Sequence, residues 1–175
     1  MTLIELMKTR RSIRSFLPKS VRDEDIAEIL DAARLAPSGG NRQRWKFIYV
    51  KEPQVLRVVK NCSPGFYGNA PVAIIIGLEG EANTSSSTVG ILDVGFAAEN
   101  ILLAAYSLGL GGCAIASFIP QAVKKVIKAP DNFQPILVVS IGYPDSTPNM
   151  PKKKNLSELV YLNEYGKAWD MEGSS

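Results

Sequence analysis

The sequence predicts a fold of the α+β or α/β class, in which a small central sheet is covered by helices. Two apolar runs rich in branched residues, 72–78 (VAIIIGL) and 134–144 (QPILVVSIGYP), are typical of strands buried on both faces. Between them, residues 89–108 form a long apolar run interrupted by Asp93 and Glu99, which predicts a buried helix. Further strand and helix patterns surround these three elements, so we expect helices to pack on the sheet.

The N-terminal elements follow from helical spacing and from turn residues. A short apolar stripe at 3–7 predicts an opening helix. Ser20 stands where an N-cap is expected for a second helix over 22–36, whose first turn is acidic. Pro37 and the glycine-rich loop after it end this helix.

The remaining elements are predicted from alternation, proline and glycine. Residues 45–51 alternate as a strand does, and 53–60 suit a helix that begins at a proline. Residues 109–117 (GLGGCAIAS) are expected to form a glycine turn, and 119–129 a helix. The strand-like tail at 159–162 has no obvious partner in its own subunit, so we expect it to add to a neighbouring protomer's sheet.

The composition is typical of one globular domain and excludes several kinds of site. The chain has 175 residues, of which 46% are hydrophobic and 21% charged. Cys62 and Cys113 form neither a CxxC pair nor a ligand cluster, which favours reduced thiols and argues against a zinc site. The chain contains no histidine, so Ser-His-Asp and Cys-His triads are excluded. No metal is expected.

Charge and hydropathy argue against nucleic acid and membranes as partners. The net charge of +3 arises from 20 basic and 17 acidic side chains and is too small for a typical nucleic-acid binder. The N-terminus lacks the apolar run of a secretory signal. Asp93 and Glu99 would each cost roughly 3 kcal/mol at a bilayer centre. We therefore expect a soluble, cytoplasmic protein.

Basic residues gather near both ends of the chain. The segment 8–16 (KTRRSIRSF) carries guanidinium groups and hydroxyls, which are well suited to bind a phosphate: Arg10, Arg11, Ser12 and Arg14. Near the other end, 152–154 is a run of three lysines. Two solvated charge runs are the alternative interpretation, and a basic nucleic-acid binder is a further one.

A polar glycine loop, 36–45 (APSGGNRQRW), follows the second predicted helix. Its glycines allow a ligand to approach the backbone closely, and its polar side chains offer donors and acceptors to a ring edge. These residues are Ser38, Gly39, Gly40, Asn41 and Gln43. A helix C-terminal turn would explain the glycines equally well, but not the two amide side chains.

In this order and at these distances, the motifs resemble the nitroreductase family of FMN-dependent oxidoreductases. The resemblance is carried by RRSIRSF, AARLAPSGGNRQRW, APVAIIIG, DVGFAAENILLAAYSLGLGGCAI, VVSIGYP and the lysine run. It implies one domain over residues 1–175 with a central, mostly antiparallel sheet flanked by helices. It also implies an intertwined homodimer whose C-terminal segments reach the partner and whose FMN lies at the subunit interface.

The resemblance further implies which residues hold the cofactor. Arg10 and Ser12 match positions that bind the FMN phosphate, with Arg11 contributing largely through its backbone. Arg14 matches a cation near the pyrimidine edge of the flavin. A lysine would replace the arginine that is common in this family at the phosphate: Lys152, Lys153 or Lys154.

Two further segments are expected to line the flavin ring. One is a loop contributed by the partner subunit: Pro37, Ser38, Gly39, Asn41 and Gln43. The other donates a backbone amide to the reactive N5 atom: Cys113, Ala114, Ile115, Ala116 and Ser117. Since some members carry an acidic residue or glycine at the position of Ala116, only its backbone is expected to take part. No catalytic side chain is required, because the flavin carries the chemistry.

The implied activity is a ping-pong transfer of hydride from NADH or NADPH, through the flavin, to an electron-poor acceptor such as a nitroaromatic or a quinone. One alternative is a relative that uses FMN for reductive dehalogenation, reduction of activated double bonds or flavin fragmentation. The other is a flavin-binding protein without significant turnover. The motifs indicate FMN but specify neither the acceptor nor the nicotinamide donor.

Overall fold

The computed structural model describes residues 1–80 and 86–169. In this part of the chain one four-stranded antiparallel sheet has the strand order β1-β2-β4-β3. Its strands are β1 (Trp45–Val50), β2 (Val72–Glu79), β3 (Gly111–Ile115) and β4 (Phe133–Gly142). The helices around it are α1 (Leu3–Thr9), α2 (Asp23–Arg34), α3 (Pro53–Asn61), α4 (Ser86–Ser107) and α5 (Pro120–Val126). The α+β class with an antiparallel sheet is thus confirmed.

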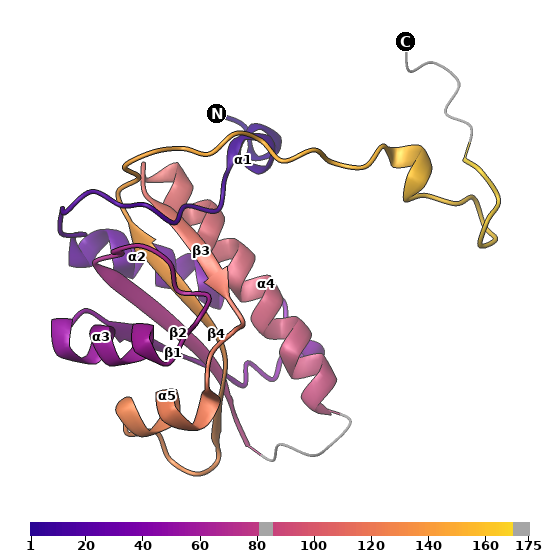
Figure 1. Ribbon diagram of the computed structural model, residues 1–175. Coiled ribbons are helices and arrows are strands. Elements are labelled where there is room, and N and C mark those ends of the chain that lie inside the picture. The colour runs from indigo at the N-terminus through magenta and orange to yellow at the C-terminus, as the bar shows by residue number, and fades with distance from the viewer. Residues whose placement is uncertain (81–85, 170–175) are drawn as a thin grey trace.

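Helices cover both faces of the sheet (Figure 1). Ile74 and Ile76 of β2 lie in the core with α2 and α4. The alternate residue, Ile75, lies in a second core with Val59 of α3 and Val123 of α5. Each fully buried side chain of this size contributes about 1.5–3 kcal/mol relative to exposure. Burial on both faces explains why β2 is an uninterrupted apolar run.

Helix α4 lies along one face of the sheet. Its inner side is buried through Val94, Ala97 and Ile101. Over Thr88–Ser107 it is long and apolar enough to cross a membrane by length and composition alone. Its contacts are those of a core helix, since it packs on α2 and on the sheet and its Asn100 side chain donates to a carbonyl of α2.

Two local predictions were wrong. The N-cap of α2 is Arg22, not Ser20, and no side chain caps that end. Most of the expected glycine turn is strand β3, in which Cys113 pairs with Ser140 of β4. Within the described residues the tail forms a 3-10 turn, η2 (Leu156–Glu158), followed by one isolated bridge, and its addition to a neighbouring protomer's sheet stays a prediction. Figure 1 shows this tail extending away from the body.

Candidate functional site

The N-terminal basic segment lies against the edge strand β3. Ser12 forms a parallel bridge with Gly112, and the N–H of Ile13 donates to the Gly112 carbonyl at 3.0 Å. Gly111 allows this approach, because a Cβ atom there would lie 2.4 Å from Cγ1 of Ile13. Gly111 therefore serves close packing of the basic segment, whereas a Cβ atom at Gly112 would lie 2.8 Å from the Ser140 carbonyl oxygen of β4.

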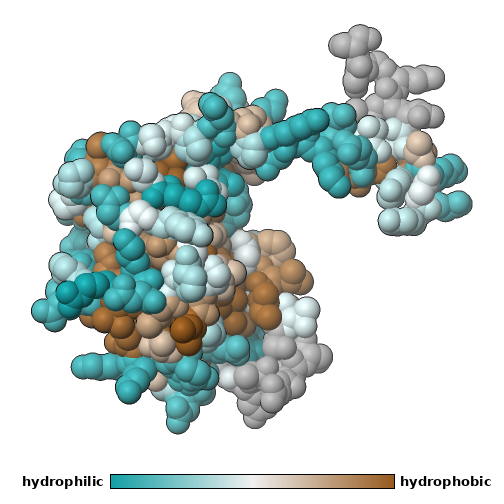
Figure 2. All heavy atoms as spheres, viewed as in Figure 1, coloured by the Kyte–Doolittle hydropathy of each residue, from teal (hydrophilic) through white to brown (hydrophobic). Residues whose placement is uncertain are grey.

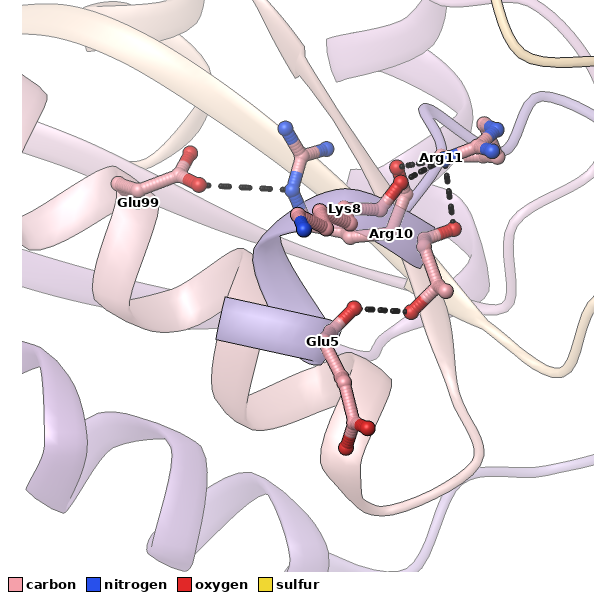
Figure 3. Close-up of polar contacts among 6 residues, drawn as sticks. Glu5, Lys8, Arg10, Arg11 and Glu99 are labelled. Atoms are coloured by element: carbon pink, nitrogen blue, oxygen red, sulfur yellow. Dashed lines mark hydrogen bonds and ion pairs between the residues drawn. The ribbon is translucent and has the colours of Figure 1, made fainter. Parts of the chain in front are cut away.

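Helix α1 determines where the arginines begin. A capping box between Thr2 and Glu5 starts the helix, and the backbone N–H of Arg10 closes it on the Leu6 carbonyl at 2.8 Å. The Nη1 atom of Arg11 donates to three carbonyls at the end of α1, those of Lys8, Thr9 and Arg10 (Figure 3). This use of the Arg11 side chain is consistent with the expectation that Arg11 contributes to a ligand site largely through its backbone, which stays a prediction.

A cavity of about 380 Å³ brings together the basic residues from the two ends of the chain. From the N-terminal part it is lined by Met7, Lys8, Arg10, Arg11, Ser12 and Arg14, and from the C-terminal part by Pro148, Asn149, Met150, Pro151 and Lys153. No carboxylate is among these lining residues. We call this cavity the cationic cavity. Of the three lysines in the run, it includes Lys153 and neither Lys152 nor Lys154.

The guanidinium of Arg10 is held from one side. Its Nε atom is buried, lies 3.4 Å from Oε1 of Glu99 on α4, and has no hydrogen-bond partner of good geometry. The terminal nitrogens of Arg10 point away from Glu99 (Figure 3). The terminal nitrogens are thus directed away from the counter-ion, and Ser12 and further cations line the same cavity. This arrangement fits a phosphate monoester such as that of FMN.

The predicted ring-lining loop is built on the 3-10 turn η1 (Gly39–Asn41). Left-handed backbone conformations occur at Gly40 (φ 60°), Asn41 (φ 54°) and Gln43 (φ 48°). Such conformations persist in non-glycine residues only where the surroundings hold them, and they are frequent at functional sites. Here the Gln43 N–H donates to Oγ of Ser38 at 3.1 Å, and the Gly39 N–H donates to the buried Asp93 of α4 at 3.1 Å.

The loop and the cationic cavity are separate within one chain. A second cavity of about 240 Å³ lies beside the loop, lined by Gly39, Gly40, Arg42, Arg44, Val89, Gly90 and Asp93. It shares no lining residue with the cationic cavity, and Pro37 lines neither. This separation supports the expectation that the loop serves the flavin of a partner subunit, which stays a prediction.

Strand β3 presents the third predicted segment. The side chains of Cys113 and Ile115 are buried, and those of Ala114, Ala116 and Ser117 are exposed. Since β3 is at the edge of the described sheet, alternate backbone groups face away from β4, and the bridge to Ser12 covers only the start of the strand. A backbone role for this segment is thus consistent with its place, while its contact with the flavin stays a prediction.

The sequence reasoning missed two residues that organise the site. Asp93 and Glu99 were interpreted only as interruptions of an apolar helix. In the fold, Asp93 holds the loop and Glu99 contacts Arg10. For Asp93 the available signal was an ionised side chain in a helix that otherwise buries apolar residues, since a buried charge needs a partner. Glu99 is 47% exposed and gave no such signal.

Comparison with known proteins shows the family and supports the fold. Residues 7–64 and 54–143 match the "Nitroreductase family". A protein of Archaeoglobus fulgidus, named "Putative NADH dehydrogenase/NAD(P)H nitroreductase", is 37% identical over 150 residues, which cover 81% of this chain and 84% of that protein. The solved structure of an FMN-dependent nitroreductase from Clostridium difficile R20291 has a TM-score of 0.78 and 33% identity, covering 93% of this chain and 100% of that one.

A relative with a different named activity also matches over most of its length. The iodotyrosine deiodinase of Thermotoga neapolitana is 27% identical over 190 residues, covering 93% of this chain and 98% of that protein. The resemblance indicated by the sequence motifs is confirmed by the family match and by the similarity in fold. The chain therefore belongs to the nitroreductase family.

Proposed function

We propose that this protein is an FMN-dependent oxidoreductase that transfers hydride from NADH or NADPH to an electron-poor small molecule, such as a nitroaromatic or a quinone, in a ping-pong cycle. The observation that carries the proposal is the cationic cavity. It is lined by Arg10, Ser12 and Arg14 and also by Lys153, which follows Arg14 by 139 residues in the chain. Residues so distant in sequence line one cavity that has no carboxylate among its lining residues, and the family match supports FMN as its ligand.

In this proposal the chain binds and orients the cofactor. Arg10, Ser12 and Lys153 hold the phosphate, and Arg14 lies toward the pyrimidine edge, where a positive charge stabilises developing negative charge. The backbone of 113–117 and the partner's loop over 37–43 line the ring. FMN supplies the capacity to accept and donate hydride, so no catalytic side chain is needed.

The site is proposed to be completed in a homodimer. Along its N-terminal half, α4 exposes apolar side chains that a lone subunit would leave in water: Val89, Ile91, Leu92 and Phe96. Figure 2 shows hydrophobic surface in the region where Figure 1 places α4. The extended tail exposes more: Leu156, Leu159, Tyr161, Leu162, Tyr165 and Trp169. Surfaces of this kind mark interfaces. We propose one domain over residues 1–175, which acts in the cytoplasm without nucleic-acid or membrane partners.

The test is direct. The purified protein is expected to be yellow, to release FMN on denaturation, and to consume NADH or NADPH steadily when a quinone or nitroaromatic is added. Arg10→Ala serves as the matched variant and should retain much less FMN while the thermal midpoint of the apo-protein changes little. A colourless protein that takes up no added FMN would contradict the proposal. Flavin binding without consumption of NADH or NADPH would instead indicate a flavin-binding protein without significant turnover.

Reductive dehalogenation is a second candidate, favoured by the similarity to the iodotyrosine deiodinase over nearly the whole chain. The two candidates share the cofactor site and differ in the acceptor. Reduced protein mixed with iodophenols should release iodide under this alternative, whereas the first candidate predicts faster reoxidation by quinones and nitroaromatics.

A further inference from the structure

We infer that Glu99 is a positioning residue for the cofactor phosphate: it fixes the guanidinium of Arg10 so that both terminal nitrogens face an anion in the cationic cavity. The inference rests on the proposed function, because it takes the FMN phosphate as the ligand of Arg10. It adds a residue on α4 that is outside the motifs predicted to touch FMN.

Glu99 contacts the Nε atom of Arg10 and leaves the two terminal nitrogens for a phosphate. Oε1 of Glu99 lies 3.4 Å from the buried Nε, and Figure 3 shows the terminal nitrogens directed away from that carboxylate. Arginine binds an anion in bidentate fashion through two parallel N–H groups. A counter-ion at Nε therefore leaves both terminal nitrogens available, and within the described residues no protein acceptor binds either of them.

Position and charge indicate that Glu99 supports Arg10 rather than competing with it. Glu99 does not line the cationic cavity, whereas Lys8, Arg14 and Lys153 do. The phosphate would therefore meet cations on the cavity side, and the carboxylate would remain behind Arg10. The neighbouring Arg11 is already bound to the carbonyls at the end of α1, so it cannot replace Arg10 without breaking that cap.

The expected benefit is orientation rather than fold stability. The side chains of Arg10 and Glu99 are 22% and 47% exposed, and ion pairs with this degree of exposure contribute little to folding. An arginine side chain has several freely rotating bonds, so holding it before the ligand arrives lowers the entropy lost on binding. Removing Glu99 should therefore affect binding of the phosphate much more than folding.

The experiment compares FMN with riboflavin, which has the same ring but no phosphate, by titrating apo-protein and following flavin fluorescence. Glu99→Ala should weaken FMN binding roughly tenfold, within the range of coupling found in shared hydrogen-bond and ion-pair networks, while riboflavin binding stays the same. Glu99→Gln keeps the shape of the side chain but removes the counter-ion, and it should weaken FMN binding as Glu99→Ala does, because the contact with Nε is an ion pair without hydrogen-bond geometry. Asp31→Ala, which removes an exposed ion pair with Arg34 on α2, should change neither affinity.

The outcomes separate this inference from the proposed function. If wild-type protein binds FMN and Glu99→Ala leaves the ratio of FMN to riboflavin affinity unchanged, the positioning role is wrong and the proposed function stands. The same conclusion follows if Glu99→Ala still weakens FMN binding in an Arg10→Ala background. Wild-type protein that binds no FMN overturns both. Thermal midpoints and sedimentation of every variant identify any loss caused by misfolding or dissociation, which would lower riboflavin binding as well.

Discussion

Asp93 on α4 accepts a 3.1 Å hydrogen bond from the backbone N–H of Gly39, 54 residues away in the chain. Further along the same helix, Glu99 lies 3.4 Å from the Nε atom of Arg10. Helix α4 thus contacts the predicted ring-lining loop through one carboxylate and an arginine of the predicted phosphate site through another. Because the loop and Arg10 are proposed to serve different parts of the flavin, substitutions on α4 should have separable effects.

Asp93→Ala is expected to weaken binding of both FMN and riboflavin, because the loop over 37–43 loses the acceptor that holds Gly39. Leaving a partly buried N–H without an acceptor should also lower the free energy of unfolding by about 1–3 kcal/mol. Flavin titration and urea denaturation measure the two effects. Asp31→Ala is the control, since its ion pair with Arg34 is exposed. A loss restricted to FMN would contradict the role assigned to the loop.

Lys153→Ala is expected to weaken FMN binding, and Lys152→Ala is not, because only Lys153 of this pair lines the cationic cavity. A charge-assisted hydrogen bond is worth about 1.5–3 kcal/mol, which corresponds to roughly tenfold or more in the dissociation constant. Titrations at low and high salt should show that Lys153→Ala also reduces the salt dependence of binding. A larger effect of Lys152→Ala would contradict this prediction and would assign Lys152, rather than Lys153, to the phosphate.

Gly111→Ala is expected to displace the basic segment from β3. The added Cβ would lie 2.4 Å from Cγ1 and 2.8 Å from Cβ of Ile13, and such overpacking costs about 1–3 kcal/mol of stability. Ile13→Ala removes the clashing Cγ1 atom at the cost of a cavity. The double variant should therefore lose less free energy of unfolding than the sum of the losses measured for the two single variants. Simple additivity in denaturant unfolding would show that the two residues do not meet.

Phe96→Asp is expected to shift the protein from dimer to monomer and to reduce FMN retention, because a charge would replace an exposed apolar side chain on the proposed interface face of α4. Val58→Asp on α3 places the same charge at another exposed apolar position, on the opposite face of the sheet, and should leave the dimer intact. Sedimentation and flavin absorbance measure both. A wild-type monomer that retains FMN would refute the interface model.

Elements with strong local patterns could be predicted from the sequence. Strand β2 and helix α3 were expected within a residue or two of their observed bounds, because two-sided burial and an N-terminal proline leave clear traces. The family motifs around Arg10 and Gly39 were also recognisable locally. The wrong predictions concern positions whose structure depends on long-range contacts. Gly111 and Gly112 resemble a turn in sequence, but both pair with β4, and Gly111 packs against Ile13.

By itself, the sequence determined the α+β class, the family and the basic and glycine-rich segments of the candidate site, because these depend on residue type and short spacing. Only the tertiary structure distinguished Lys153 from its neighbours and joined Glu99 to Arg10. Such contacts arise when the chain folds back through the sheet and α4, and short-range spacing contains no information about which distant side chains will meet.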